Sequence, residues 1–174
     1  LYNPNSMKKE DIVAVSYLDA CFFKRDEKVP DGFDFTEHVA VGKLVALTDS
    51  DITLAFLEKD GESERGLVLP INSLILKDEH ISDTKLKFPG KKSIGSDIVV
   101  HWSDPVHFQN GAKPESSTVM RSEGELFSVT EQAVVLIDPK TFRQDNESHP
   151  KDSGVDIAYL FIPKRLIIKC EFYE

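Results

Sequence analysis

One strand–turn–strand pattern occurs twice in this chain of 174 residues, and it restricts the possible folds more than any other feature of the sequence. In the first copy, an apolar run over residues 38–47 is followed by the polar turn 48–51 and the alternating run 52–57. Apolar runs on either side of an Asp- and Ser-containing turn are typical of a β-hairpin. The outline returns 82 residues later: residues 42–45 and 52–55 match residues 124–127 and 134–137.

Two further blocks recur in the same order around the hairpins. Upstream, residues 15–20 match residues 100–105 at an offset of 85, and downstream residues 67–75 match residues 160–168 at an offset of 93. The offset between equivalent residues increases from 82 at the hairpins to 93 downstream, which places an insertion of about eleven residues in the second copy. Chance similarity among short β patterns is the alternative, but three blocks in one order favour a duplicated domain.

Gly42 lies inside the first predicted strand, where a glycine usually marks a bulge or a sharp bend. A bent sheet favours a small barrel. We therefore predict an all-β fold of two tandem small, strongly bent β-barrels, packed together because one copy alone hides only about 60% of its unfolded surface. The predicted organisation is a first barrel over residues 7–77, a polar linker over 78–96 and a second barrel over 97–174, with an inserted loop over 139–155.

The run Val41-Gly42-x-Leu44 followed by Asp51-Ile52-x-Leu54 resembles the first motif of Sm-like barrels, which share their small bent architecture with SH3-like barrels. This resemblance implies a strongly bent barrel and, for several members of the family, RNA binding. The chain is also similar to a loosely defined class of uncharacterised short bacterial and phage proteins. That likeness depends on Tyr17-Leu18-Asp19-Ala20, Val41-Gly42-Lys43-Leu44 and the segment from Gly66 to Pro70, and it implies no particular chemistry.

The chain is acidic, with 21 Lys and Arg against 30 Asp and Glu, a net charge of −9 and a pI near 5.1. This balance disfavours nucleic acid, which proteins meet with basic clusters, and an anionic membrane surface. No run approaches the roughly 20 apolar residues of a membrane span, so we expect a cytoplasmic protein. Cys21 and Cys170 each lie in or beside an apolar run, which favours two free thiols over a disulfide.

Two carboxylates stand at equivalent points of the repeats, each two residues after an aromatic residue. Asp19 follows Tyr17, and Asp104 follows Trp102. Either the carboxylates cap the ends of the preceding strands by accepting backbone N–H groups, or each aromatic and acidic pair forms part of a repeated ligand pocket. We therefore take these four residues as the candidate ligand-binding residues.

His101, Asp104 and His107 lie within seven residues, and imidazole and carboxylate groups suit zinc, iron or copper. Alternate side chains of a strand point to opposite faces, so the two histidines converge only if the following loop folds back. The first repeat has Ser16 where the second has His101. This set is accordingly a weak metal candidate.

Two long loops are expected after the first strand of each copy, over residues 21–35 and 103–116. In the first, four Phe residues either close one end of the barrel or belong to a functional loop. The sequence has no nucleophile elbow, phosphate-binding glycine loop or paired His-Glu helix motif, so we predict no catalytic residues, no enzymatic activity and no cofactor.

Three functions follow as hypotheses. The first is a non-catalytic binding or adaptor protein that engages a protein partner, or a second copy of itself, through loops and sheet edges. The second is an Sm-like protein that binds RNA, single-stranded nucleic acid or a nucleotide by stacking on Tyr17 and Trp102, although the net charge disfavours it. The third is a metal-dependent enzyme at His101, Asp104 and His107.

Overall fold

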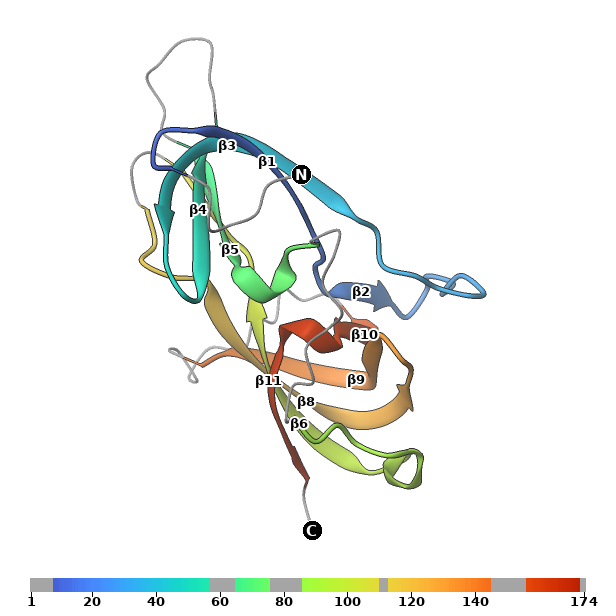
Figure 1. Ribbon diagram of the computed structural model, residues 1–174. Coiled ribbons are helices and arrows are strands. Elements are labelled where there is room, and N and C mark those ends of the chain that lie inside the picture. Colours follow the sequence, from blue (N-terminus) through green and yellow to red (C-terminus); the bar gives the residue numbers. More distant parts are fainter. Residues whose placement is uncertain (1–7, 57–64, 76–85, 110–112, 145–155, 173–174) are drawn as a thin grey trace. The chain divides into compact units, whose positions relative to one another are not determined.

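The computed structural model describes residues 8–56, 65–75, 86–109, 113–144 and 156–172 (Figure 1). Within these ranges the protein is all-β, with two antiparallel sheets and no α-helix, as the sequence predicts. The strands are β1 (Ile12–Tyr17), β2 (Cys21–Lys24), β3 (His38–Leu47), β4 (Asp51–Ala55), β5 (Gly66–Pro70), β6 (Asp97–Asp104), β7 (Val106–Phe108), β8 (Thr118–Val129), β9 (Ala133–Arg143), β10 (Ile157–Pro163) and β11 (Ile167–Phe172).

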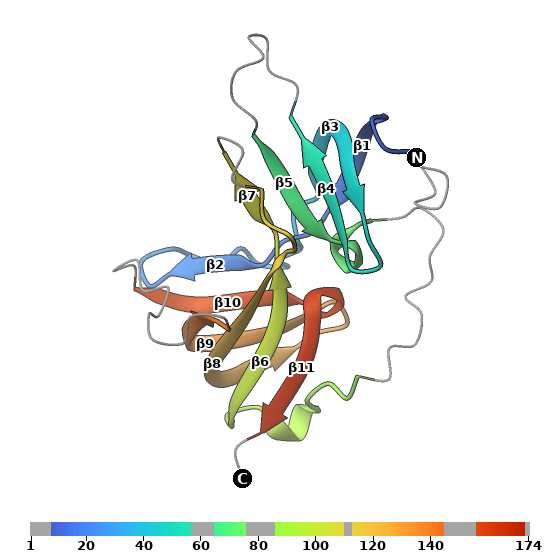
Figure 2. The ribbon, with the colours of Figure 1, turned by 90° about the vertical axis from the view of Figure 1, so that its left-hand side faces the viewer.

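The chain forms two compact units, and neither is a continuous segment. Unit 1 contains a five-stranded sheet in the order β1-β3-β4-β5-β7, and unit 2 contains a six-stranded sheet in the order β11-β6-β8-β9-β10-β2 (Figure 2). Each order has two ends, so no closed barrel is found among the described strands. Unit 1 comprises Leu1–Leu18, Glu37–Asp83 and Asp104–Thr118, and unit 2 comprises Asp19–Thr36, Thr84–Ser103 and Val119–Glu174.

The predicted repeat of the hairpin is confirmed residue by residue. Leu44 of β3 lies opposite Leu54 of β4, and 82 residues later Leu126 of β8 lies opposite Leu136 of β9. A bulge follows at the equivalent place in both hairpins, directly after Leu44 and directly after Leu126. The turns match as well, because the N–H of Thr48 donates to Asp51 at 2.9 Å and the N–H of Thr130 donates to Ala133 at 2.9 Å.

Gly42 and Gly124 lie at equivalent places in the two hairpins, and at both places the partner strand comes close. A Cβ built on Gly42 would lie 2.6 Å from the carbonyl oxygen of Ala55, and one built on Gly124 would lie 2.9 Å from that of Ile137. Real side chains do not come this close to a backbone oxygen, so the two strands of each hairpin approach here only because residues 42 and 124 are glycines.

The two expected loops after the first strand of each copy contain strands instead. In unit 2, β2 pairs with β10, and Cys21 lies opposite Phe161. In unit 1, β7 pairs with β5, and Val106 lies opposite Val68. These pairs are equivalent under the offsets of 85 and 93, so each repeat gives one strand to the sheet that is built mainly from the other repeat. We call Asp19–Thr36 the first arm and Asp104–Thr118 the second arm.

The sequence prediction missed this exchange because it assigned each strand to the segment around it. The ranges 7–77 and 97–174 therefore describe the repeats, whereas the compact units each take one arm from the other repeat. Residues 78–85 of the expected linker lie outside the described residues, and residues 86–96 belong to unit 2. Strand β9 continues to Arg143, so residues 139–143 of the expected loop are strand, and residues 145–155 lie outside the described residues.

A short 3₁₀ turn follows the proline that ends β5 and the proline that ends β10. These turns are Ile71–Ser73 after Pro70 and Lys164–Leu166 after Pro163. Leu74, which follows the first of these turns, forms an isolated bridge to Tyr17. In unit 2 the equivalent residue, Ile167, pairs with Trp102 as the first residue of β11.

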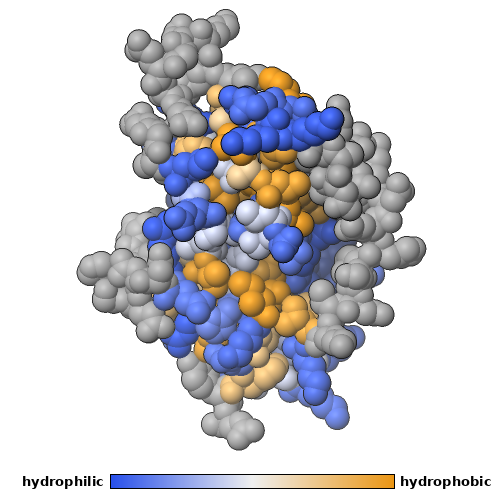
Figure 3. All heavy atoms as spheres, turned by 60° about the vertical axis from the view of Figure 1, so that its left-hand side comes forward, coloured by the Kyte–Doolittle hydropathy of each residue, from blue (hydrophilic) through white to orange (hydrophobic). Residues whose placement is uncertain are grey.

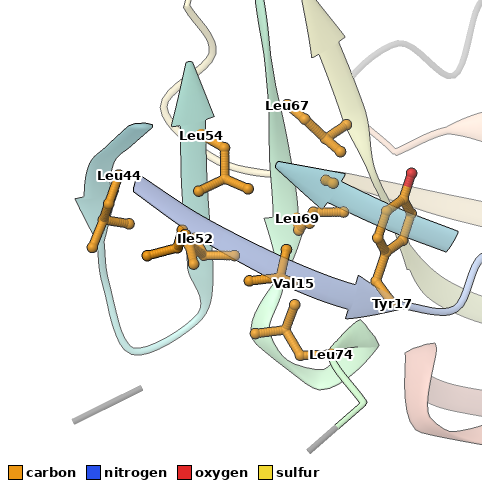
Figure 4. Packing of buried hydrophobic residues seen from close by; sticks show 10 residues of the cluster. Val15, Tyr17, Leu44, Ile52, Leu54, Leu67, Leu69 and Leu74 are labelled. Carbon is orange, nitrogen blue, oxygen red and sulfur yellow. The ribbon is translucent and has the colours of Figure 1, made fainter. Parts of the chain in front are cut away.

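Each unit has its own apolar core on one face of its sheet. In unit 1, side chains from β1, β3, β4 and β5 point toward one another around Ile52 and Leu54, both fully buried (Figure 4). In unit 2 the core is centred on Trp102, and its other fully buried members include Ile98, Met120, Leu126, Leu136, Leu160 and Ile162.

Candidate functional site

Trp102 is a core residue of unit 2 and not the wall of an open pocket. Its side chain is 1% exposed, and the indole Nε1–H donates to Ser122 Oγ at 3.0 Å. The Ser122 hydroxyl is in turn 2.9 Å from Thr141 Oγ1, so the buried indole N–H ends a short chain of hydrogen-bonded hydroxyls. A buried Trp needs such a partner for its N–H. Trp102 in this position cannot stack on a ligand from solvent.

Tyr17 ends β1 in unit 1 and is 9% exposed. Its ring belongs to the core cluster (Figure 4). The ring centroid lies 5.4 Å from that of His38, at an interplanar angle of 30°. The two aromatic candidates thus occupy equivalent positions in the two repeats, as predicted, but both contribute mainly to packing.

Asp19 and Asp104 stand where the chain begins each arm. Asp19 is the first residue of the first arm, and its Oδ1 accepts the N–H of Ala20 at 2.7 Å. Asp104 is the last residue of β6 and the first residue of the second arm. The equivalence of these two positions fits the interpretation in which each carboxylate belongs to the end of a strand.

In the described part of the chain, His101, Asp104 and His107 are not brought together in a group of three side chains that could hold a metal ion. His101 contacts a carboxylate of the neighbouring strand instead, with 3.1 Å between its Nε2 and Glu171 Oε2. The pKa of the Glu171 carboxyl is lowered mainly by its hydrogen bond with Lys169 and, to a smaller extent, by its hydrogen bond with His101. His107 lies on the exposed side of β7.

Both cysteines are free thiols, as the sequence predicts, and both are half-buried. Burial raises the pKa of the Cys170 thiol to about 11, and burial followed by the charge of Asp19 raises that of Cys21. A thiol with a raised pKa is mostly protonated at neutral pH and is a poor nucleophile.

An apolar outer face on strands β1 and β3, at one end of the sheet of unit 1, is a surface feature that was not predicted from the sequence. Ile12 is 54% exposed, Val39 64% and Val41 54%, although all three sit in regular strand. The pairing places Ala14 opposite Val41 and Ser16 opposite Val39, so the exposed residues lie on one face. The signal in the sequence is the unbroken apolar run in both strands, a pattern that is also typical of a strand buried on both faces.

Strand β1 ends the sheet order of unit 1. Near its C-terminal end the outer side is already occupied, because the N–H of Ile75 donates to the Ser16 carbonyl and the N–H of Leu18 donates to that of Ser73. Among the described residues, the backbone groups that remain for pairing with an added strand are those near Ile12 and Ala14. Glu10 and Lys43 form an ion pair, with 2.8 Å between the carboxylate and the ammonium nitrogen, beside Ile12, whose pairing partner is Lys43. On the face drawn in Figure 3, hydrophobic side chains reach the surface between hydrophilic ones. We call Ile12, Val39, Val41 and the outer side of β1 the β1 edge.

No helix in the described residues is long and apolar enough to cross a membrane. Comparisons with protein-family models, with curated proteins and with solved structures find no match for this chain. The function is therefore inferred from the residues and their geometry alone.

Proposed function

We propose that this is a non-catalytic binding protein that takes an extended segment of a protein partner on the β1 edge. The observation that carries the proposal is the exposure of Ile12, Val39 and Val41 beside a terminal strand. Contiguous exposed apolar side chains on a folded protein often mark a binding surface, and a terminal strand supplies main-chain hydrogen bonds to an added strand. An added strand would place alternate side chains beside Ile12 and Ala14.

The partner segment in this proposal is extended and apolar at alternate positions. Main-chain pairing with β1 provides affinity, whereas specificity comes from the side chains that extend the apolar face of Val39 and Val41. The protein itself contributes no reacting group to this arrangement. An adaptor role follows, in which the fold presents a rigid edge and the partner supplies the strand.

The proposal includes an Sm-like or SH3-like architecture, with two strongly bent sheets as tandem barrels. The support for this finer assignment is the bulge and the close approach of strands at Gly42 and Gly124, which are devices that bend small sheets. Small bent barrels commonly carry binding sites on their exposed strands and loops.

The proposed function is tested by selection from a library of displayed extended peptides. The wild-type protein is used for capture, and Val41→Lys is used for counter-selection because it changes an exposed side chain without entering the core. The matched control is Ile94→Lys in unit 2, where the side chain is 47% exposed. We expect peptides with alternating apolar residues that bind wild type and Ile94→Lys but not Val41→Lys. Equal binding to all three proteins would contradict the proposal.

Nucleic-acid binding and metal-dependent catalysis are the alternative functions. The first is less well supported because Trp102 is buried and the net charge is −9. Anisotropy of a labelled single-stranded RNA that rises on adding protein, and falls with salt, would favour it. The second would be favoured by stoichiometric metal in protein that was purified without chelator.

A further inference from the structure

Strand β11 is the terminal strand of the six-stranded sheet in unit 2, and among the described strands its only neighbour is β6. Two of its apolar side chains remain at the surface, with Ile168 and Phe172 each 45% exposed. Between them stand a cation and an anion two positions apart, Lys169 and Glu171. A terminal strand with exposed apolar residues is a template for pairing with another strand.

The order of residues in β11 is self-complementary. If two such strands run antiparallel with Cys170 opposite Cys170, then Lys169 lies opposite Glu171 of the other strand. Ile168, the residue at which β11 bulges against β6, then faces Phe172 of the other strand at the end of the pair. Both charges therefore meet an opposite charge, and both exposed apolar residues meet an apolar residue. Directly opposed pairs of these kinds stabilise antiparallel strands, whereas like charges in the same positions would destabilise them.

We propose that β11 is a self-association surface, on which the β11 strand of a second copy adds antiparallel around Cys170. The arrangement has two-fold symmetry, so each strand presents the same residues to the other, as in most homodimers. It would join two six-stranded sheets into one continuous sheet.

Charge complementarity identifies a second copy of this chain as the partner of β11. Lys169 and Glu171 already contact one another within one strand, and Lys169 is the main cause of the lowered pKa of Glu171. In the proposed pair, each ammonium also faces the carboxylate across the junction. Strand β1 has no charged residue between Ile12 and Tyr17, so pairing of two β1 strands would bring no opposite charges together. Charge complementarity therefore favours a second copy as the partner of β11 and not of β1.

A junction of one short strand buries less surface than the roughly 1,200–2,000 Å² of a stable interface, so the dimer is weak and depends on protein concentration. The like net charge of two copies also opposes association at low salt, and this repulsion is screened at physiological ionic strength. The inference uses the same strand-addition mode as the proposed function but another edge, another unit and another occupant. Either can fail without the other.

The first test measures mass against concentration by sedimentation or light scattering, at moderate salt. We expect a monomer–dimer equilibrium in the wild type. Lys169→Glu and Glu171→Lys each place like charges opposite one another and should each return the protein to monomer over the same concentration range. The double variant Lys169→Glu with Glu171→Lys restores opposite pairs and should restore the dimer. A wild type that is monomeric throughout, or a dimer that neither single reversal weakens, would overturn the proposal.

The second test leaves the charges of β11 unchanged and so remains valid if a reversal harms folding. In a Cys21→Ser variant, Cys170 is the only thiol, and directly opposed residues of an antiparallel pair have Cβ atoms about 4.5–5.5 Å apart, close to disulfide range. Because burial raises the pKa of the Cys170 thiol to about 11, oxidation with a copper catalyst is carried out at alkaline pH. It should give a Cys170–Cys170 dimer whose yield rises with protein concentration. Val41→Lys should leave this yield unchanged, which separates the result from the β1 edge. A dimer by mass without this cross-link would refute the proposed register.

Discussion

The ring of Phe108 fills the space that a side chain on Gly66 would need. In unit 1 these two residues lie opposite one another in β7 and β5, and a Cβ built on Gly66 would overlap both the Phe108 ring and the carbonyl oxygen of Leu54. Phe108 is 4% exposed, so its ring is held in place by its surroundings. The second arm thus depends on the absence of a side chain in the sheet it joins.

Gly66→Ala should destabilise the protein by about 1–3 kcal/mol, the usual cost of forcing extra atoms into a packed site. The reason is that one neighbour is backbone, which cannot move aside. Urea unfolding followed by circular dichroism measures the change. Gly90→Ala is the matched control, because nothing lies within 4 Å of a Cβ at that position, and it should unfold like the wild type.

Ser122→Ala removes the acceptor of the Trp102 indole N–H inside the core of unit 2. A buried donor without its partner costs about 1–3 kcal/mol, so the melting temperature should fall. Trp102 is the one Trp in the chain, so its fluorescence reports this site directly during unfolding. Ser116→Ala, at an exposed position, is the control. Identical stability of the two variants would show that the hydrogen bond contributes nothing.

Arg25 joins the first arm to strand β9 and to the residue directly before β10, both in unit 2. Its guanidinium lies 2.5 Å from Asp138 and 2.7 Å from Asp156, and the hydrogen bond from Arg25 lowers the pKa of Asp156. A carboxyl with a lowered folded-state pKa contributes stability above its unfolded value, and this contribution is lost as pH falls through the folded value. The stability difference between wild type and Arg25→Gln should therefore be present at pH 7 and shrink below about pH 4.

The pKa of Asp156 gives a direct measure of the same contact. Carboxyl NMR should show it rising toward its usual value of about 3.9 in Arg25→Gln. Lys28→Gln, which removes a positive charge at an exposed position of the same arm, should leave it in place. The groups are exposed, so high salt should reduce the difference between the proteins.

The exchanged arms predict that the two halves of the chain stay together when the chain is cut between them. A protease site introduced within residues 76–85 divides the repeats, yet each unit contains strands from both halves. We expect both fragments to elute together in size-exclusion chromatography after cleavage and to keep the β-type circular dichroism spectrum. Fragments that separate under native conditions would contradict the assigned arms.

The residues of the hairpins were sufficient to predict their pairing. Turn chemistry at Thr48 and Thr130 and alternation in the following strand are local signals, and pairing across a short turn needs no other information. The offset of 82 then linked Leu44 with Leu126 correctly because no insertion separates the two strands of either hairpin.

The arms were not predictable in the same way. Strand β2 has four residues and β7 has three, and their partners β10 and β5 lie in the other repeat. Periodicity identifies a strand's faces but not its neighbour, and strands this short give almost no periodicity. Trp102 was likewise taken as a ligand residue, since an aromatic residue before an acidic one has the same appearance in a core as in a pocket.

The reciprocal strands also make the two repeats depend on one another, because the sheet built mainly from one repeat is completed by a segment encoded in the other half of the chain. A substitution in either arm is therefore expected to affect the stability of the sheet encoded mainly by the other half.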